Sequence, residues 1–224
     1  MIGRVIYSCG QPPPRGYAPC TREDGHDGPC AMDIAPVPLD YIETFTGRRL
    51  SPLSPDPSAI VIVDIAHALS LQCRFSGHTR YHYSVAQHSV LVSRLLEEQG
   101  QSREVQLWGL LHDASEAYLV DLPTPLKNSY HLGPAYRDAE RHLMVAICAR
   151  FGLDPVEPQA VRRADACALA TEVRDLMPGR PEHWSTRNLT EAPHPTHLEE
   201  WSPRSAKRQF LLHFCNLEAT AGPT

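Results

Sequence analysis

The sequence predicts a mainly α-helical protein: a bundle of about six helices, preceded by a small β-hairpin and by a segment that carries Cys and His. Three observations predict this class. After residue 60, apolar residues recur at spacings near three and four, the period of a helix packed on one face. Capping residues, glycines and prolines divide this part into segments of helical length. Strand-like runs around a turn are confined to residues 41–53.

The composition bounds the class of protein. A chain of 224 residues can form one sizeable core, or one domain with an appendage. Contents of 42% hydrophobic and 21% charged residues are typical of a soluble globular protein. The net charge of −5 argues against stable nucleic-acid binding, which needs a basic face. The chain has no apolar run of membrane length and no signal-peptide pattern, so we expect a cytoplasmic protein without membrane contacts.

Residues 1–34 carry four residues that can bind zinc, in the spacing C-x10-C-x5-H-x3-C: Cys9, Cys20, His26 and Cys30. The segment has almost no apolar residues, so burial cannot offset the entropy of ordering it. A tetrahedral Cys3His site would supply that stability, and we expect a structural zinc ion here. The alternative is a tail in which the cysteines are incidental.

Residues 35–63 read as a hairpin and linker ahead of a helical domain, 64–224. Two short strand-like runs flank Thr46-Gly47 within Tyr41–Leu53, which predicts a hairpin. The Pro-rich residues 54–57 end it. Asp64 is then expected to cap a short helix that ends near Arg74.

The helices that follow have recognisable ends. Ser84 with Gln87 three residues later forms a capping box and opens a helix that ends near Glu98. After the break at Gly100, a central helix is expected from about Arg103 to Leu119. It must stop there because the Leu-Pro-Thr-Pro run at 122–125 cannot continue a helix.

Three more helices complete the bundle. Pro134 suits the first turn of a long helix that ends at Phe151-Gly152. The next helix is expected over residues 155–177, opened by Asp154-Pro155, and the last from Ser202-Pro203 to about Leu217. The segment 178–201 between them is longer than a compact domain usually tolerates in a loop.

The central helix concentrates groups that bind metals. His112 and Asp113 stand side by side, and adjacent helix positions point about 100° apart, so both can reach one ion. Glu116 lies one turn further on the same side, and Asp121 follows where the helix should end. One imidazole and three carboxylates within ten residues suggest a metal site with a spare acid. Asp121 has an alternative role as a cap for the turn before Pro123.

Two residues on other helices can join this pair. His88 lies in the first turns of the helix that Ser84 opens, and Asp165 lies among the apolar residues of the 155–177 segment. Two neutral imidazoles and two carboxylates suit Mn, Fe, Co, Ni or Zn better than Ca, which prefers oxygen ligands. Alternatively, His88 is an ordinary helix histidine, and Asp165 pairs with Arg162 or Arg163.

The order H…HD…D resembles the HD-domain metal-dependent phosphohydrolases. The sequence around these residues is similar to that of their 5′-deoxynucleotidase branch and of related, often phage-encoded, deoxynucleotide triphosphohydrolases. Three segments carry the resemblance: CRFSGHTRYHYSVAQHS at 73–89, LHDASEAYLVDLPTPLK at 111–127 and VRRADACAL at 161–169. They organise residues 64 to about 176. A bare His-Asp pair is weak, whereas HDASE followed by DLPTP is specific.

The resemblance implies an HD-domain helical bundle and assigns the roles of the site. One divalent transition metal, Co, Mn, Fe, Ni or Zn, is held by four ligands: His88, His112, Asp113 and Asp165. Glu116 takes the position of the carboxylate that orients or activates the attacking water, supported by Asp121. A divalent ion also neutralises the charge that protects a phosphate ester from nucleophiles.

The resemblance also implies substrate contacts. Arg74 matches a phosphate-binding arginine, and a guanidinium can grip phosphate oxygens in a fork. Phe75 matches the position of an aromatic residue that crowds the sugar and rejects a 2′-hydroxyl. In the family this position usually holds Trp. Lys127, just after DLPTP, is expected to be a second phosphate contact.

The expected substrate is a small deoxynucleotide: a monophosphate that yields deoxynucleoside and phosphate. One alternative is a phage-type dNTP triphosphohydrolase, acting for example on dATP in the host cytoplasm. Another HD hydrolase, such as a cyclic-nucleotide phosphodiesterase, would need a loop that is not recognisable here. A third alternative is a non-catalytic HD binding module that recruits partners through residues 1–34. Many relatives form homodimers or higher homo-oligomers, and the resemblance extends that expectation to this chain.

Overall fold

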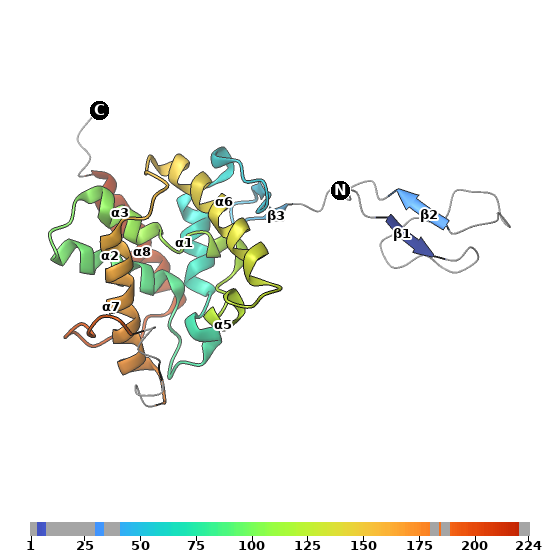
Figure 1. Ribbon diagram of the computed structural model, residues 1–224. Coiled ribbons are helices and arrows are strands. Elements are labelled where there is room, and N and C mark those ends of the chain that lie inside the picture. Colours follow the sequence, from blue (N-terminus) through green and yellow to red (C-terminus); the bar gives the residue numbers. More distant parts are fainter. Residues whose placement is uncertain (1–3, 8–29, 34–40, 180–183, 185–188, 220–224) are drawn as a thin grey trace. The chain divides into compact units, whose positions relative to one another are not determined.

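A computed structural model describes residues 4–7, 30–33, 41–179, 184 and 189–219. The chain divides into two compact units, Met1–Asp40 and Tyr41–Thr224 (Figure 1). In the first unit, β1 (Arg4–Tyr7) pairs antiparallel with β2 (Cys30–Asp33). Three of the expected zinc ligands, Cys9, Cys20 and His26, lie outside the described residues, and Cys30 opens β2.

The second unit is mainly helical, which confirms the predicted class. Its described elements include two short strands, two 3-10 turns and eight α-helical segments. In chain order they are β3 (Ile42–Glu43), β4 (Arg49–Leu50), η1 (Pro57–Ala59), α1 (Ile62–Leu71), η2 (Arg74–Gly77), α2 (Val85–Glu98), α3 (Arg103–Leu111), α4 (Glu116–Leu119), α5 (Thr124–Lys127), α6 (Gly133–Phe151), α7 (Gln159–Leu176) and α8 (Pro203–Ala219). None of the described helices is long and apolar enough to cross a membrane.

The expected hairpin is present, but Asp64 does not cap α1. β3 and β4 pair antiparallel around Gly47, whose φ of +77° belongs to the left-handed region that glycine adopts freely. α1 begins at Ile62, ahead of Asp64. The Asp64 carboxylate accepts bonds from the Thr46 backbone N–H (2.8 Å) and hydroxyl (2.9 Å). The acid therefore ties the hairpin to α1, a tertiary role that its place near a helix start did not reveal.

Asp64→Ala should lower the free energy of unfolding by about 1–3 kcal/mol. The substitution removes two hydrogen bonds between Thr46 and the buried carboxylate of Asp64, and hydrogen bonds to charged groups contribute about that much. Urea unfolding followed by circular dichroism measures the change. Asp138→Ala, at an exposed residue of α6, is the matched control and should change stability by less than about 0.5 kcal/mol. Equal effects of the two substitutions would contradict the tertiary role.

The ends of α1, α2 and α7 test the capping signals. The Ser84 hydroxyl accepts the Gln87 backbone N–H (3.2 Å), as the capping box predicts. α1 ends at Leu71, three residues early, because Gln72 turns into extended backbone ahead of a bridge from Cys73 to Ser84. α7 begins at Gln159, about four residues late. The Asp154 carboxylate accepts the Val156 N–H in a separate turn, so it opens no helix.

The prediction of one continuous central helix is wrong, because the helix breaks at the expected metal ligands His112 and Asp113. α3 ends at Leu111, and α4 resumes at Glu116. Between them the Ala114 N–H bonds to Leu111 O, and the Glu116 N–H bonds to Asp113 O. These i to i−3 bonds wind the chain more tightly than an α-helix does. The His112 and Asp113 side chains therefore leave the regular α-helical spacing.

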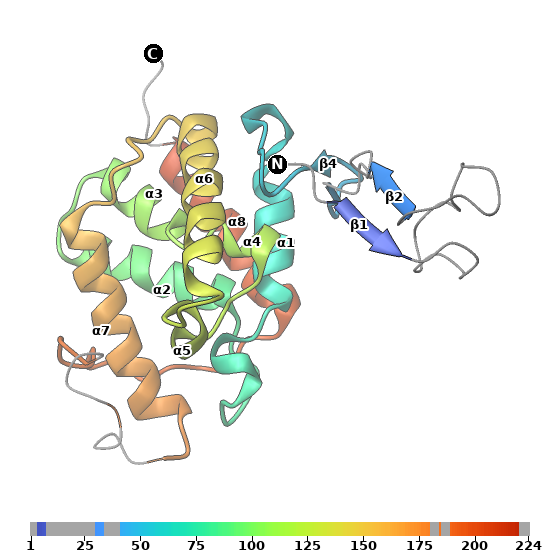
Figure 2. The same cartoon turned by 45° about the vertical axis from the view of Figure 1, so that its right-hand side comes forward.

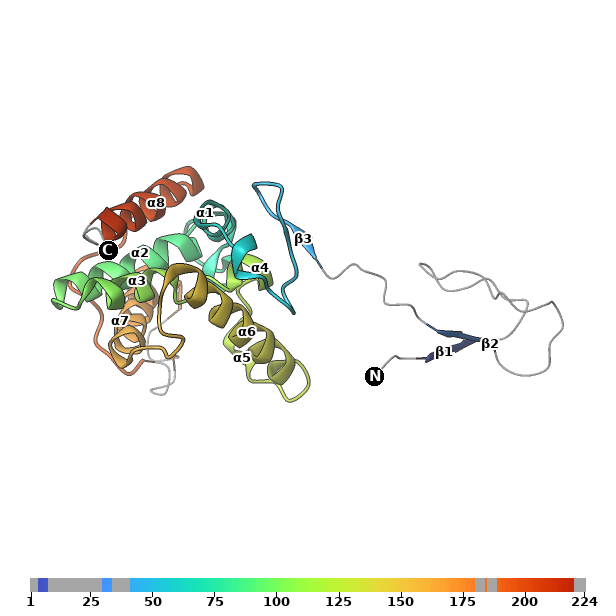
Figure 3. The same ribbon diagram turned by 90° about the horizontal axis from the view of Figure 1, so that it is seen from above.

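Helix α2 is the central element of the bundle, because it contacts α1, α3, α7 and α8 (Figures 2 and 3). The core is built from apolar residues of these helices and of α6. α3 approaches α2 closely at Gly109, where a Cβ would collide with the Leu96 side chain. This close approach positions the end of α3, and so His112, beside the helix that carries His88.

Candidate metal centre

Three side chains from separate parts of the chain converge on one point. His88 comes from α2, His112 follows α3, and Asp165 comes from α7. Their ligand atoms lie within 4.8 Å of one another, close enough for one ion. His88 Nε2 is 3.1 Å from His112 Nε2 and 3.2 Å from Asp165 Oδ1. His112 Nε2 lies 3.9 Å from the same carboxylate oxygen.

Asp113, the fourth expected ligand, reaches the same two imidazoles. Its Oδ2 atom lies 3.3 Å from His112 Nε2 and 3.5 Å from His88 Nε2. The same oxygen accepts a bond from Arg74 Nη1 at 3.3 Å. The structure thus brings together all four residues that the sequence nominated, with Asp113 shared between the imidazoles and a guanidinium.

Both histidines are oriented with Nε2 toward the cluster. His88 Nδ1 contacts Glu172 Oε1 at 2.6 Å, and His112 Nδ1 contacts the Gly109 carbonyl oxygen at 2.8 Å. Both partners only accept, so each Nδ1 donates and carries the proton. In a neutral ring, each Nε2 atom then carries an unprotonated lone pair. Two lone pairs at 3.1 Å repel each other unless a proton or a cation lies between them, which is the donor arrangement of a metal site.

The charges around the cluster also favour a cation at this point. Burial alone would lower the pKa of His112, but the carboxylates of Asp113 and Asp165 outweigh it and raise that pKa to about 10. Burial would raise the pKa of Asp113, and the neighbouring His112, His88 and Arg74 hold it well below its usual range. The site therefore attracts positive charge, and the donor set of two imidazoles and two carboxylates fits a borderline divalent ion.

Glu116 lies beside this cluster, almost fully buried. Its Oε1 atom accepts a bond from Lys127 Nζ at 3.1 Å. Oε2 is buried and has no hydrogen-bond partner among the described residues. Burial, and then the charges of Asp113 and Asp121, raise the pKa of Glu116 to about 8. A buried carboxyl group with one free oxygen at the wall of a cavity is suited to hold a water molecule or a proton.

The segment after Glu116 is clamped by a residue that the sequence did not single out. Gln72 donates its side-chain N–H to the Glu116 carbonyl (2.8 Å), and its side-chain oxygen accepts the Asp121 backbone N–H (3.0 Å). Val120, which follows the end of α4, has a φ of +73°, so the chain turns sharply into Asp121. The clamp and the turn together direct Asp121 into the same cavity as Glu116.

Arg74 and Lys127 are both held by carboxylates. Arg74 Nε donates to Glu172 Oε2 at 3.1 Å, in addition to its contact with Asp113. Lys127 Nζ donates to Glu116 and to Glu140, each at 3.1 Å. Both cations line the cavity, but Lys127 is less available for phosphate than the sequence suggested, because it is placed between two acids.

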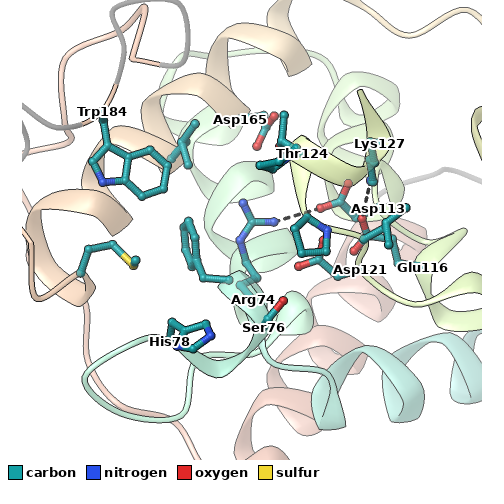
Figure 4. Close-up of a pocket in the computed structure, with 16 residues that line it drawn as sticks. Arg74, Ser76, His78, Asp113, Glu116, Asp121, Thr124, Lys127, Asp165 and Trp184 are labelled. Carbon is teal, nitrogen blue, oxygen red and sulfur yellow. Dashed lines mark hydrogen bonds and ion pairs between the residues drawn. The ribbon is translucent and has the colours of Figure 1, made fainter. Parts of the chain in front are cut away.

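A cavity of about 680 Å³ opens beside the cluster. One end carries the charged residues around Asp113, Asp165 and Lys127, and the other carries aromatic and apolar side chains (Figure 4). Its lining consists of Arg74, Phe75, Ser76, His78, Asp113, Glu116, Asp121, Leu122, Pro123, Thr124, Pro125, Lys127, Asp165, Leu169, Met177 and Trp184. A smaller cavity of about 390 Å³ shares Asp113 and Asp165 with it. The cluster is therefore reached from two cavities.

The apolar end contains Phe75 and Trp184. Their rings make an edge-to-face contact with centroids 5.8 Å apart. Phe75 and its neighbour Ser76 both have a φ of +53°, a backbone conformation that is rare for a bulky residue and is associated with functional sites. Phe75 was expected at the site, but Trp184 was not. It lies in the long 178–201 segment, where no periodicity relates it to Phe75.

Glu172 is a further site residue that sequence reasoning missed. It is fully buried on α7 and contacts both His88 and Arg74. Burial would raise its pKa, but the charges of Arg74 and His88 outweigh that effect and lower it. A signal was present: Glu172 follows Asp165 by seven residues, two helical turns, so the two lie on one face of the predicted helix.

No protein-family model matches the chain. Two curated proteins are similar to it. The uncharacterized protein YfdR of Escherichia coli (strain K12) is 37% identical over 179 residues, which cover 80% of this chain and 96% of YfdR. An uncharacterized protein of Rhodobacter capsulatus is 41% identical over 134 residues, which cover 58% of this chain and 67% of that protein.

Proposed function

The chain belongs to the family of YfdR, and we propose that it is a metal-dependent phosphohydrolase of the HD-domain type, acting on 2′-deoxynucleotides. The observation that carries the proposal is the orientation of His88 and His112. Both direct Nε2 lone pairs at one point, together with oxygens of Asp113 and Asp165. Such a point needs a cation, and the buried free oxygen of Glu116 lies on the adjoining cavity.

The four ligands of the ion would be His88, His112, Asp113 and Asp165. A bound divalent ion supplies charge neutralisation at the phosphate and lowers the pKa of a water molecule. Glu116 Oε2 is positioned to accept a proton from the attacking water, and Lys127 on Oε1 holds the carboxylate in place. Arg74 presents its guanidinium to the same cavity and grips the phosphate oxygens.

The charges of the cavity favour a monophosphate. Its lining carries four carboxylates, from Asp113, Glu116, Asp121 and Asp165, and two permanent cations, from Arg74 and Lys127. With all six groups ionised the lining has a net charge of −2, which one divalent ion brings to zero. A triphosphate would bring more uncompensated negative charge into such a site than a monophosphate does. A volume of about 680 Å³ is in the range of sites for small molecules and accommodates a nucleotide.

The apolar end suits the sugar and base. With the phosphate at the ion, the rest of the nucleotide extends toward Phe75 and Trp184, whose aromatic faces can contact a deoxyribose or stack on a base. Contact with the Phe75 ring would place a 2′-hydroxyl against an apolar face, which disfavours a ribonucleotide.

The proposal is tested by incubating the purified full chain with Mn²⁺ or Co²⁺ and panels of dNMPs, NMPs, dNTPs and a cyclic nucleotide. Chromatography of the products separates phosphate release from triphosphate release. We expect phosphate and deoxynucleoside from dNMPs, and slower turnover of NMPs. Release of triphosphate alone would replace the monophosphatase with a dNTP triphosphohydrolase. Metal binding by folded protein with no turnover of any nucleotide would reject both activities and favour a binding module.

Trp184→Ala should raise KM for a dNMP by about 10-fold and change kcat less, because stacking on an aromatic ring contributes about 1–3 kcal/mol per base. Steady-state kinetics over a range of dNMP concentrations provide the measurement. Tyr130→Ala removes an aromatic that is 88% exposed and lines neither described cavity, so it is the matched control. An unchanged KM in the Trp184 variant would exclude this residue from the substrate site.

A further inference from the structure

Glu172 is a fully buried carboxylate whose two oxygens have different partners. Oε1 contacts His88 Nδ1 at 2.6 Å, and Oε2 accepts from Arg74 Nε at 3.1 Å. Around it on α7 lie the buried residues Ala168, Thr171 and Val173. A carboxylate is costly to bury, and apolar packing alone does not require one. Its two contacts explain why an acid occupies this position.

The contact with His88 acts on the metal centre. A carboxylate that accepts from Nδ1 holds the proton there, keeps the Nε2 lone pair directed at the ion, and makes the ring a stronger ligand. The other imidazole, His112, has only a backbone carbonyl in the equivalent place. The negative charge on this side of the centre therefore acts on His88 specifically.

The contact with Arg74 acts on the substrate end. Glu172 holds Nε while Asp113 holds Nη1, so the guanidinium is fixed from two sides. Arg74 follows Cys73 into a short 3-10 turn in which two non-glycine residues, Phe75 and Ser76, have a positive φ. Anchoring Arg74 therefore also anchors the start of the turn that presents Phe75 to the cavity.

We propose that Glu172 is a positioning residue that couples the metal centre to the phosphate-binding arginine, by fixing His88 with one oxygen and Arg74 with the other. Its action on Arg74 rests on the proposed function, whereas its action on the ion does not. One carboxylate accepts from both donors. An amide of the same shape can accept from only one, turns an N–H₂ group toward the other, and gives neither donor a negative charge. Glu172→Gln should therefore weaken ion binding and substrate binding together.

The first measurement is titration of the metal-free full chain with Co²⁺, followed by the visible absorption of the bound ion. Loss of a carboxylate that supports a ligating histidine typically weakens metal binding 10–100-fold, and we expect that range for Glu172→Gln. Asp64→Asn is the matched control, because it alters another buried acceptor carboxylate, bonded to Thr46 and not to any residue of the cluster. Its Co²⁺ affinity should stay within about twofold of the unaltered chain.

The second measurement is KM for a dNMP at saturating Co²⁺, where the ion site is filled in both proteins. We expect KM to rise about 10-fold in Glu172→Gln, since Arg74 loses one of its two anchors. Thermal melts verify that the variant folds. If it does not, Glu172→Asp replaces it, because this variant keeps the charge and withdraws it from both donors by one methylene.

The outcomes separate this inference from the proposed function. Wild-type Co²⁺ affinity in a folded Glu172 variant overturns the coupling, even if the chain hydrolyses dNMPs. Weakened affinity without any nucleotide turnover by the unaltered chain supports the role at the ion and rejects the phosphohydrolase. Weakened affinity with an unchanged KM overturns the link to Arg74.

Discussion

His112→Ala is expected to abolish Co²⁺ binding at the cluster and to lower phosphate release from a dNMP by roughly 10³-fold or more. The substitution removes one of the two Nε2 lone pairs that meet at 3.1 Å, so the remaining donors no longer enclose an ion. A divalent ion supplies several kcal/mol of transition-state stabilisation, and each 1.36 kcal/mol is tenfold in rate. Metal content after gel filtration and initial rates in Mn²⁺ or Co²⁺ give the two readouts.

His142→Ala provides the control for this experiment. His142 lies on α6 with an exposed side chain and contacts only Asp138 among the described carboxylates, at 3.9 Å. Its removal should leave metal content and rate within about twofold. Stoichiometric Co²⁺ in the His112 variant would show that the ion lies elsewhere. The expected zinc ligands at the N-terminus form a separate candidate site, so the assay should also include Cys20→Ala. The loss of metal in this variant should be independent of the loss of metal in His112→Ala.

Glu116→Gln is expected to lower kcat by 10²–10⁴-fold while Co²⁺ affinity changes little. The amide keeps the shape of the side chain and the place beside Lys127, but it cannot accept a proton from water. Stopped-assay kinetics at saturating dNMP measure kcat, and Co²⁺ titration measures the ion site separately. Equal losses of kcat and of metal affinity would make Glu116 a support of the ion and not the base.

The pH profile sharpens the prediction. Burial, with the charges of Asp113 and Asp121, raises the pKa of Glu116 to about 8, and only the deprotonated form can act as a base. kcat/KM should therefore rise with increasing pH through that pKa, and a bound cation moves this rise to a pH below 8. Glu116→Gln should remove the rise. Glu140→Gln, which alters the other carboxylate bound to Lys127, should retain it.

The site was predictable from the sequence to the extent that its residues are marked by local spacing. His112, Asp113 and Glu116 stand within five positions, and Ser84 marks the start of the helix that carries His88. The break between α3 and α4 was not predictable. Residues 112–115 have no Gly or Pro to announce it, and the tighter turns result from interactions with the rest of the fold. Trp184 was missed for a related reason, because no period relates a residue of a long irregular segment to its partner.

By itself, the sequence determined the mainly helical class, the hairpin at Gly47, the cap at Ser84, the end of α6 at Gly152 and the short list of metal-binding side chains. These features depend on hydrophobic period, capping chemistry and backbone preference, which act between near neighbours in the chain. Only the tertiary structure decided that Asp64 holds Thr46 instead of a helix end, and that Glu172 joins His88 to Arg74. The partners in these contacts lie 18, 84 and 98 residues apart. A buried carboxylate binds whichever donors the packed helices bring to it, and sequence spacing does not encode that distance.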